Sequence, residues 1–169
     1  DPAGSEDPAG APGCDRMIRT DKRLRLSKWL IVLILCFIWG NSLLPGTDSG
    51  NLSGGIMTWI NSFLGLGEAG AETLHLLIRK CAHFTEFACL GALLCWRFGM
   101  LGKNKAVAFG CGALAACIDE TIQVFVPDRG PALKDVCIDS AGVLTGIILL
   151  WVGYDYFKKR STHKSLEDK

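Results

Sequence analysis

The chain has 169 residues, of which 49% are hydrophobic, and its mean hydropathy is +0.28. This composition is too apolar for an ordinary soluble domain and is typical of a small protein that crosses a membrane several times. The formal net charge of +1 excludes little by itself, so the distribution of the charges along the chain is the more useful property.

The N-terminal segment is rich in Pro, Gly, Ala and acidic residues as far as Cys14. We expect residues 1–16 to be an added leader or a disordered linker, with Met17 as a plausible native start, and we exclude this segment from fold reasoning. The chain is therefore divided into this leader, a membrane domain over residues 17–157 and a cytoplasmic tail over residues 158–169.

Four apolar segments are candidates for membrane spans. They cover residues 28–44, 74–98, 106–126 and 136–157. At about 1.5 Å per residue, the third is long enough to cross a hydrocarbon core of about 30 Å. The first is short and is interrupted by Asn41 and Ser42. A signal peptide is the alternative for this segment, but no small-x-small cleavage site follows it, which favours an uncleaved span.

A shorter amphipathic stretch lies between the first two segments. Its apolar residues recur at i, i+3, i+4, i+7 and i+8, which places on one helix face Ile56, Trp59, Ile60, Phe63 and Leu64. The stretch is too short to span, so it predicts an interfacial or re-entrant helix on the outer leaflet; a loop with a packed helix is the alternative.

Lysine and arginine predict the orientation of the segments. They gather in three clusters, within residues 16–28, 97–105 and 158–164. Four spans place all three clusters on the same side, which is the cytoplasm by the positive-inside rule. We therefore predict an all-α integral membrane protein, built as a four-transmembrane-helix bundle with an outer interfacial or re-entrant helix and both termini in the cytoplasm.

Polar side chains inside the apolar segments are the main functional clue, because each ionisable group costs about 2.5–3.5 kcal/mol at the centre of a membrane helix. On the predicted topology every one of them falls in the outer half of the membrane or in the outer loop. Arg79, His83 and Glu86 also share one helix face by their spacing. We predict one outward-facing polar site with the ligand-binding residues Arg79, Lys80, His83, Glu86, Asp119, Glu120, Gln123, Arg129, Asp135 and Asp139.

These residue types leave several chemistries open. The set could be a structural ion network, or it could bind a divalent metal through His83 and carboxylates. It could recognise a phosphate or sugar through Arg79, Lys80 and Arg129. If the protein is an enzyme, the acid–base residues would be His83, Glu86, Asp119 and Glu120. The sequence contains no HExxH, GxSxG or P-loop motif.

Three further patterns bear on packing and partners. Gly142 and Gly146 follow Asp139 at helical spacing and would let another helix approach closely. The cysteines form no CxxC pair, so we expect most to be small buried hydrophobes, although Cys81 and Cys137 could meet on the outer side. The basic residues flank the membrane segments, where anionic lipid accounts for them, so no nucleic-acid partner is expected.

Two sequence blocks combine these polar residues at fixed spacing. The first is Arg79-Lys80-x-Ala82-His83-Phe84-x-Glu86-Phe87-x-x-Leu90-Gly91. The second is Asp119-Glu120-x-x-Gln123-x-Phe125-x-Pro127-x-Arg129, followed by Asp135-Val136-x-x-Asp139-x-x-Gly142-x-x-x-Gly146. With both blocks, residues 29–157 resemble the VanZ-like family, which is named for a protein encoded with glycopeptide-resistance genes.

The resemblance implies a small multi-span protein of the bacterial cell membrane. The founding member is associated with lowered susceptibility to teicoplanin, a lipid-tailed glycopeptide. The chain departs from the family pattern at Phe87, where Tyr is frequent, at Asp128, where Gly is common, and at Asp139, where Asn is common. The last departure adds a carboxylate to the predicted site.

Two functional hypotheses follow. In the first, the protein recognises or shields a lipid-tailed or lipid-linked envelope molecule, such as a lipoglycopeptide or a lipid-linked precursor, with membrane lipid as its surroundings. In the second, it is a membrane enzyme that acts on lipid or envelope precursors with a histidine and carboxylate site. A proton-coupled transporter is less favoured, because no polar pathway crosses the inner half.

Overall fold

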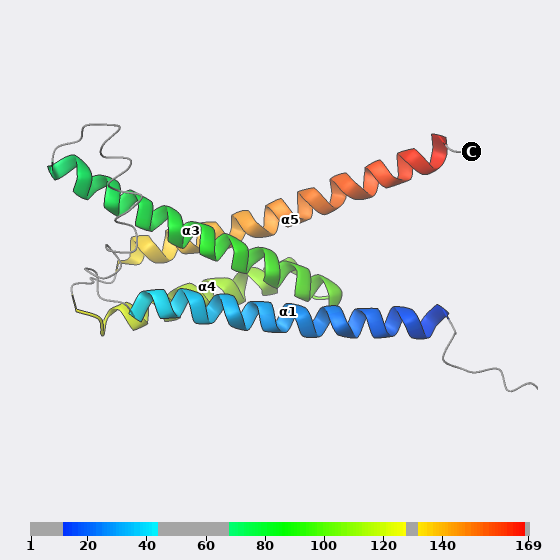
Figure 1. Cartoon of the computed structure of the whole chain (residues 1–169), viewed down its shortest axis with the longest axis horizontal. Coiled ribbons are helices and arrows are strands. Elements are labelled where there is room, and N and C mark those ends of the chain that lie inside the picture. Colours follow the sequence, from blue (N-terminus) through cyan, green and yellow to red (C-terminus); the bar gives the residue numbers. More distant parts are fainter. Residues whose placement is uncertain (1–11, 44–67, 128–131, 168–169) are drawn as a thin grey trace, which may run out of the picture.

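The computed structural model describes residues 12–43, 68–127 and 132–167. Within these ranges all regular structure is helical, and no strand occurs. The helices are α1 (Pro12–Leu43), α3 (Glu68–Met100), α4 (Lys105–Gln123) and α5 (Leu133–Glu167) (Figure 1). The predicted outer helix and Arg129 lie outside the described residues.

Three of the described helices contain a stretch that is long and apolar enough to cross a membrane: Thr20–Leu43, Lys105–Gln123 and Leu133–Arg160. These stretches support the predicted membrane protein. The polar residues of α3 lower its mean hydropathy, so α3 is less apolar than these three stretches. Its 33 residues correspond to about 50 Å of helix, which is sufficient length for a span.

Helices α1 and α5 extend furthest beyond the segments predicted for them. α1 begins at Pro12, inside the segment that we set aside as a leader, and α5 continues to Glu167 instead of ending near residue 157. Ion pairs at i, i+4 spacing support these polar extensions. Asp21 pairs with Arg25 at 2.9 Å, and Asp155 pairs with Lys159 at 3.0 Å.

The glycines of α5 allow α3 to pack closely against it, as their spacing predicts. A Cβ atom at Gly142 would lie 2.5 Å from the carbonyl oxygen of Phe84, and one at Gly146 would lie 1.8 Å from that of Ala88. On the α3 side, a Cβ atom at Gly91 would lie 2.2 Å from the carbonyl oxygen of Val143. The two backbones therefore touch along this crossing, which Figure 1 shows near the middle of α3.

The apolar core lies between the helices and is small. Its buried members are Ile38, Phe87, Leu90, Leu94, Ala108, Ala115, Ala116, Val143 and Ile147. Large apolar side chains also cover the outside of the helices, among them Trp29 and Leu33 of α1, each 67% exposed. An apolar outer surface of this kind suits contact with lipid rather than water.

The cysteines correct one expectation. Of the seven whose surroundings are described, six are exposed on helix surfaces and Cys95 is half-buried, so they are not the buried hydrophobes that the sequence predicts. Their helices turn these positions away from the core. Cys81 and Cys137 are both free thiols.

The two ends of the helical assembly differ in character. The C-terminal end of α1, the first half of α3, the end of α4 and the start of α5 lie toward the same end (Figure 1). Toward the opposite end, Arg97 of α3 donates hydrogen bonds to the carbonyl oxygen of Leu24 at 2.7 Å and to the hydroxyl of Ser27 at 3.3 Å. The polar residues of the predicted site belong to the first end.

Candidate functional site

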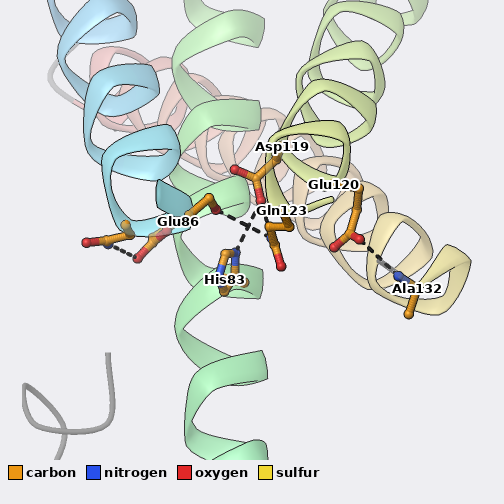
Figure 2. A network of polar contacts seen from close by, with 8 residues as sticks. His83, Glu86, Asp119, Glu120, Gln123 and Ala132 are labelled. Carbon is orange, nitrogen blue, oxygen red and sulfur yellow. Dashed lines mark hydrogen bonds and ion pairs between the residues drawn. The ribbon is translucent and has the colours of Figure 1, made fainter. Parts of the chain in front are cut away.

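The polar residues at this end come from all four described helices, and Figure 2 shows how several of them point toward one another. Asp119, Glu120 and Asp139 are buried, as is Gln123, whereas Arg79, Lys80, His83, Glu86 and Asp135 are half-buried. Burial of three carboxylates in one small protein requires compensating partners. Those partners decide what each residue can do.

Asp119 is fully buried. Its Oδ2 atom accepts a hydrogen bond from the amide nitrogen of Gln123 at 2.8 Å, one helical turn later. The same oxygen lies 3.9 Å from Nδ1 of His83, which is too far for a hydrogen bond. The other oxygen, Oδ1, is buried and has no hydrogen-bond partner among the described residues.

Glu120 points away from its neighbour Asp119, because consecutive residues of a helix face different directions (Figure 2). Its Oε2 atom accepts a hydrogen bond from the backbone N–H of Ala132 at 3.0 Å. Ala132 directly precedes α5, so Glu120 satisfies a free donor at the start of that helix. Arg79 adds its positive charge to the surroundings of Glu120. The contacts of Glu120 thus fix α4 against α5.

Helix α1 contributes two polar residues that the sequence did not place in the site. Asn41 donates a hydrogen bond from Nδ2 to Oε1 of Glu86 at 3.1 Å, and the second oxygen of Glu86 is buried without a hydrogen-bond partner in the described part of the chain. Gln123 also donates to the hydroxyl of the fully buried Ser42 at 3.4 Å. The signal was present, since Asn41 and Ser42 end an apolar segment on the same predicted side.

Lys80 of α3 and Asp135 of α5 form an ion pair. This contact places the Lys80 charge at the edge of the site, because its side chain is 43% exposed. Lys80 therefore does not neutralise the inner carboxylates directly. Of the predicted residues, Arg129 falls outside the described ranges, and the remaining nine lie on the three helices that meet here.

Among the described residues, the inner part of the site holds more carboxylates than cations. Asp119 and Asp139 are buried there, and Glu86 is half-buried. Of the two described cations of the site, Lys80 binds Asp135 and Arg79 acts on Glu120.

Three residues from three helices have a geometry that could hold a metal ion. His83 of α3, Asp119 of α4 and Asp139 of α5 each offer one ligand atom, and these atoms all lie within 4.8 Å of one another. We call these residues the His83 cluster. Imidazole nitrogen and carboxylate oxygen are ordinary ligands of divalent metals. The same arrangement could also position His83 for acid–base chemistry or for a hydrogen bond to a polar ligand.

Comparison with known proteins assigns the chain to a family. No curated protein and no solved structure matches it. The family model described as VanZ/LLP1 matches residues 29–154. This range includes the central part of each described helix and every described residue of the site. This match covers most of the chain, and the protein belongs to the VanZ/LLP1 family.

Proposed function

We propose that this protein is a bacterial cell-membrane protein that recognises or shields a lipid-tailed or lipid-linked envelope molecule at the outer face of the membrane. The observation that carries the proposal is the convergence of polar residues from α1, α3, α4 and α5 at one end of an otherwise apolar assembly. The chain belongs to the VanZ/LLP1 family. The resemblance to the VanZ-like family, whose founding member is associated with lowered teicoplanin susceptibility, supplies the biological setting.

In this proposal α3 is the second of four membrane spans, and an interfacial or re-entrant helix covers the outer leaflet near residues 56–64. Both termini lie in the cytoplasm. The basic residues near the start of α1 and the end of α5 support this orientation, since such residues remain on the cytoplasmic side. The polar site then opens outward, where lipid-linked precursors and lipoglycopeptides meet the membrane.

The ligand's polar part would contact the site, and its acyl part would contact the apolar helix surfaces. Carboxylates accept hydrogen bonds from sugar hydroxyls and amides, and the half-buried Arg79 and Lys80 at the rim could attract an anionic group. We assign Arg129 the same role, as a prediction from its position in the outer loop. An acyl tail gains about 0.8 kcal/mol per buried CH₂ group, so lipid contact would hold such a ligand at this depth.

Resistance measurements in a teicoplanin-susceptible bacterium test the proposal. Cells that produce the wild-type chain should grow at several-fold higher teicoplanin concentrations than cells without it, and a glycopeptide without an acyl tail should show a smaller difference. His83→Ala and Asp119→Asn should abolish the protection at equal protein levels. Asp155→Asn, which changes an exposed carboxylate near the opposite end, is the matched control. Full protection by the His83 and Asp119 variants would refute the proposal.

A membrane enzyme is the second candidate, and the contact between His83 and Asp119 favours it. A buried carboxylate 3.9 Å from an imidazole nitrogen can orient the ring and stabilise its protonated form during acid–base catalysis. The substrate would be a lipid or an envelope precursor. Lipid and precursor profiles of cells with wild-type protein and with His83→Ala should then differ in a defined species. Identical profiles would exclude this candidate.

A further inference from the structure

The His83 cluster combines ligand types and distances that suit a single ion. Two ligands that each lie about 2.1 Å from one metal are at most about 4.2 Å apart. The contact between His83 and Asp119 already meets this limit at 3.9 Å, and the whole set is within 4.8 Å. Small rotations of the side chains, which move the ligand atoms by about half an ångström, would bring the whole set within this limit.

An unsatisfied atom in the cluster points independently to a ligand. Asp119 is completely buried, and Gln123 occupies only its Oδ2 atom. Its Oδ1 atom has no hydrogen-bond partner within the described ranges. A buried carboxylate oxygen without a partner is strongly unfavourable, and a bound cation would supply the missing interaction.

The two buried carboxylates of the cluster also favour a bound cation. Asp139 is 2% exposed, and Asp119, which offers a ligand atom within 4.8 Å in the same cluster, is fully buried. Lys80, which pairs across α3 and α5, binds Asp135 instead. Two buried carboxylates at this separation repel each other when both are charged, and a divalent cation between Asp119 and Asp139 would attract both.

Neighbouring contacts already constrain the cluster. Gln123 holds the Asp119 carboxylate by its hydrogen bond, as second-sphere residues do for metal ligands. The close approach of Gly142 to Phe84 brings α5 against α3 one residue after His83 and one turn after Asp139. Helix packing therefore sets the distance between His83 and Asp139.

We propose that His83, Asp119 and Asp139 form a binding site for one divalent transition-metal ion, and that Zn²⁺ is the ion this donor set fits best. Zn²⁺ binds both imidazole nitrogen and carboxylate oxygen, whereas Mg²⁺ and Ca²⁺ prefer oxygen ligands alone. Three protein ligands leave a coordination position for water or for an anionic oxygen of a ligand.

The biological role of this ion rests on the proposed function, in which the open position would receive a phosphate or carboxylate oxygen of the envelope molecule. Metal binding itself can be measured without knowing that molecule. The two proposals can therefore fail separately. If Zn²⁺ binds and Asp139→Asn protects cells fully from teicoplanin, the link to the function fails and the metal site stands.

Metal analysis of the full chain purified in detergent tests the site. The exposed thiols are first alkylated, because free cysteines also bind Zn²⁺. The protein is then stripped with chelator and equilibrated with Zn²⁺, Mn²⁺ or Mg²⁺. Wild-type protein should retain about one Zn²⁺ per chain, and Mg²⁺ should bind at least 100-fold more weakly. Asp119→Asn and Asp139→Asn, which preserve side-chain shape, should weaken Zn²⁺ binding at least 10-fold.

Asp155→Asn is the matched control, since it removes an exposed carboxylate of the same helix that lies far along the chain from Asp139. It should retain Zn²⁺ with wild-type affinity. Zn²⁺ should also raise the Tm of wild-type protein and of Asp155→Asn, but not that of Asp139→Asn. The proposal is overturned if wild-type protein retains no more Zn²⁺ than Asp119→Asn, or if Asp155→Asn loses the ion to the same extent as Asp139→Asn.

Discussion

Gly146 of α5 leaves no room for a side chain against Ala88 of α3, since a Cβ atom at Gly146 would lie 1.8 Å from the Ala88 carbonyl oxygen. The obstructing atom belongs to the backbone of a helix, so it cannot move aside without shifting α3. This contact, together with that of Gly142 with Phe84, determines how closely Asp139 approaches His83. Packing and site geometry therefore depend on the same glycines.

We expect Gly146→Ala to destabilise the protein by about 1–3 kcal/mol or more, because overpacking forces two helices apart. Thermal unfolding in detergent measures the change. Gly153→Ala lies on the same helix with no atom within 4 Å of the added carbon, so it should be neutral or stabilise α5 by up to about 1 kcal/mol. Equal effects of the two substitutions would contradict this account of the α3–α5 contact.

Asn41→Ala should destabilise the protein by about 1–3 kcal/mol, because Oε1 of the half-buried Glu86 would lose its donor while Oε2 already lacks one among the described residues. The same substitution should lower the free energy of unfolding clearly less in a Glu86→Leu background, where no carboxylate accepts a hydrogen bond from the Asn41 amide. A double-mutant cycle of unfolding free energies measures this coupling. A cost that is the same in both backgrounds would show that Asn41 acts through other contacts.

Glu120→Ala should loosen the first turn of α5, since the N–H group of Ala132 loses its acceptor at 3.0 Å. Loss of an equivalent helix cap costs about 1 kcal/mol. Hydrogen exchange of the peptide that contains Ala132 should become faster in Glu120→Ala and remain near wild type in Glu120→Gln, whose side-chain oxygen still accepts. Similar exchange in both variants would argue that the negative charge matters rather than the hydrogen bond.

Arg97→Leu should weaken the packing of α3 on α1 at the basic end, because the guanidinium group donates to Leu24 and Ser27 on α1. Hydrogen bonds from charged groups contribute about 1.5–3 kcal/mol, so we expect a lower Tm. Lys159→Leu removes a charge that is 79% exposed and should change stability by no more than about 0.5 kcal/mol. A Tm loss in Lys159→Leu as large as in Arg97→Leu would contradict the prediction.

Much of the fold follows from local properties of the sequence. Runs of apolar residues of sufficient length predict helices over parts of α1, α4 and α5, and the described helices contain them. Helix ends are harder to predict, since polar extensions such as the start of α1 have no apolar period and depend on pairs such as Asp21 with Arg25. The outer helix and the binding role of each site residue stay predictions.

The sequence by itself determined that this is an α-helical membrane protein and that its costly polar residues occur near the same ends of their segments, because hydropathy and charge act within each segment. Only the tertiary structure decided which of them meet. Asp119 and Glu120 are adjacent in the chain, yet the rotation of α4 turns Asp119 toward His83 and Glu120 toward Ala132. That rotation depends on how helices pack, and here the α5 glycines set the approach to α3.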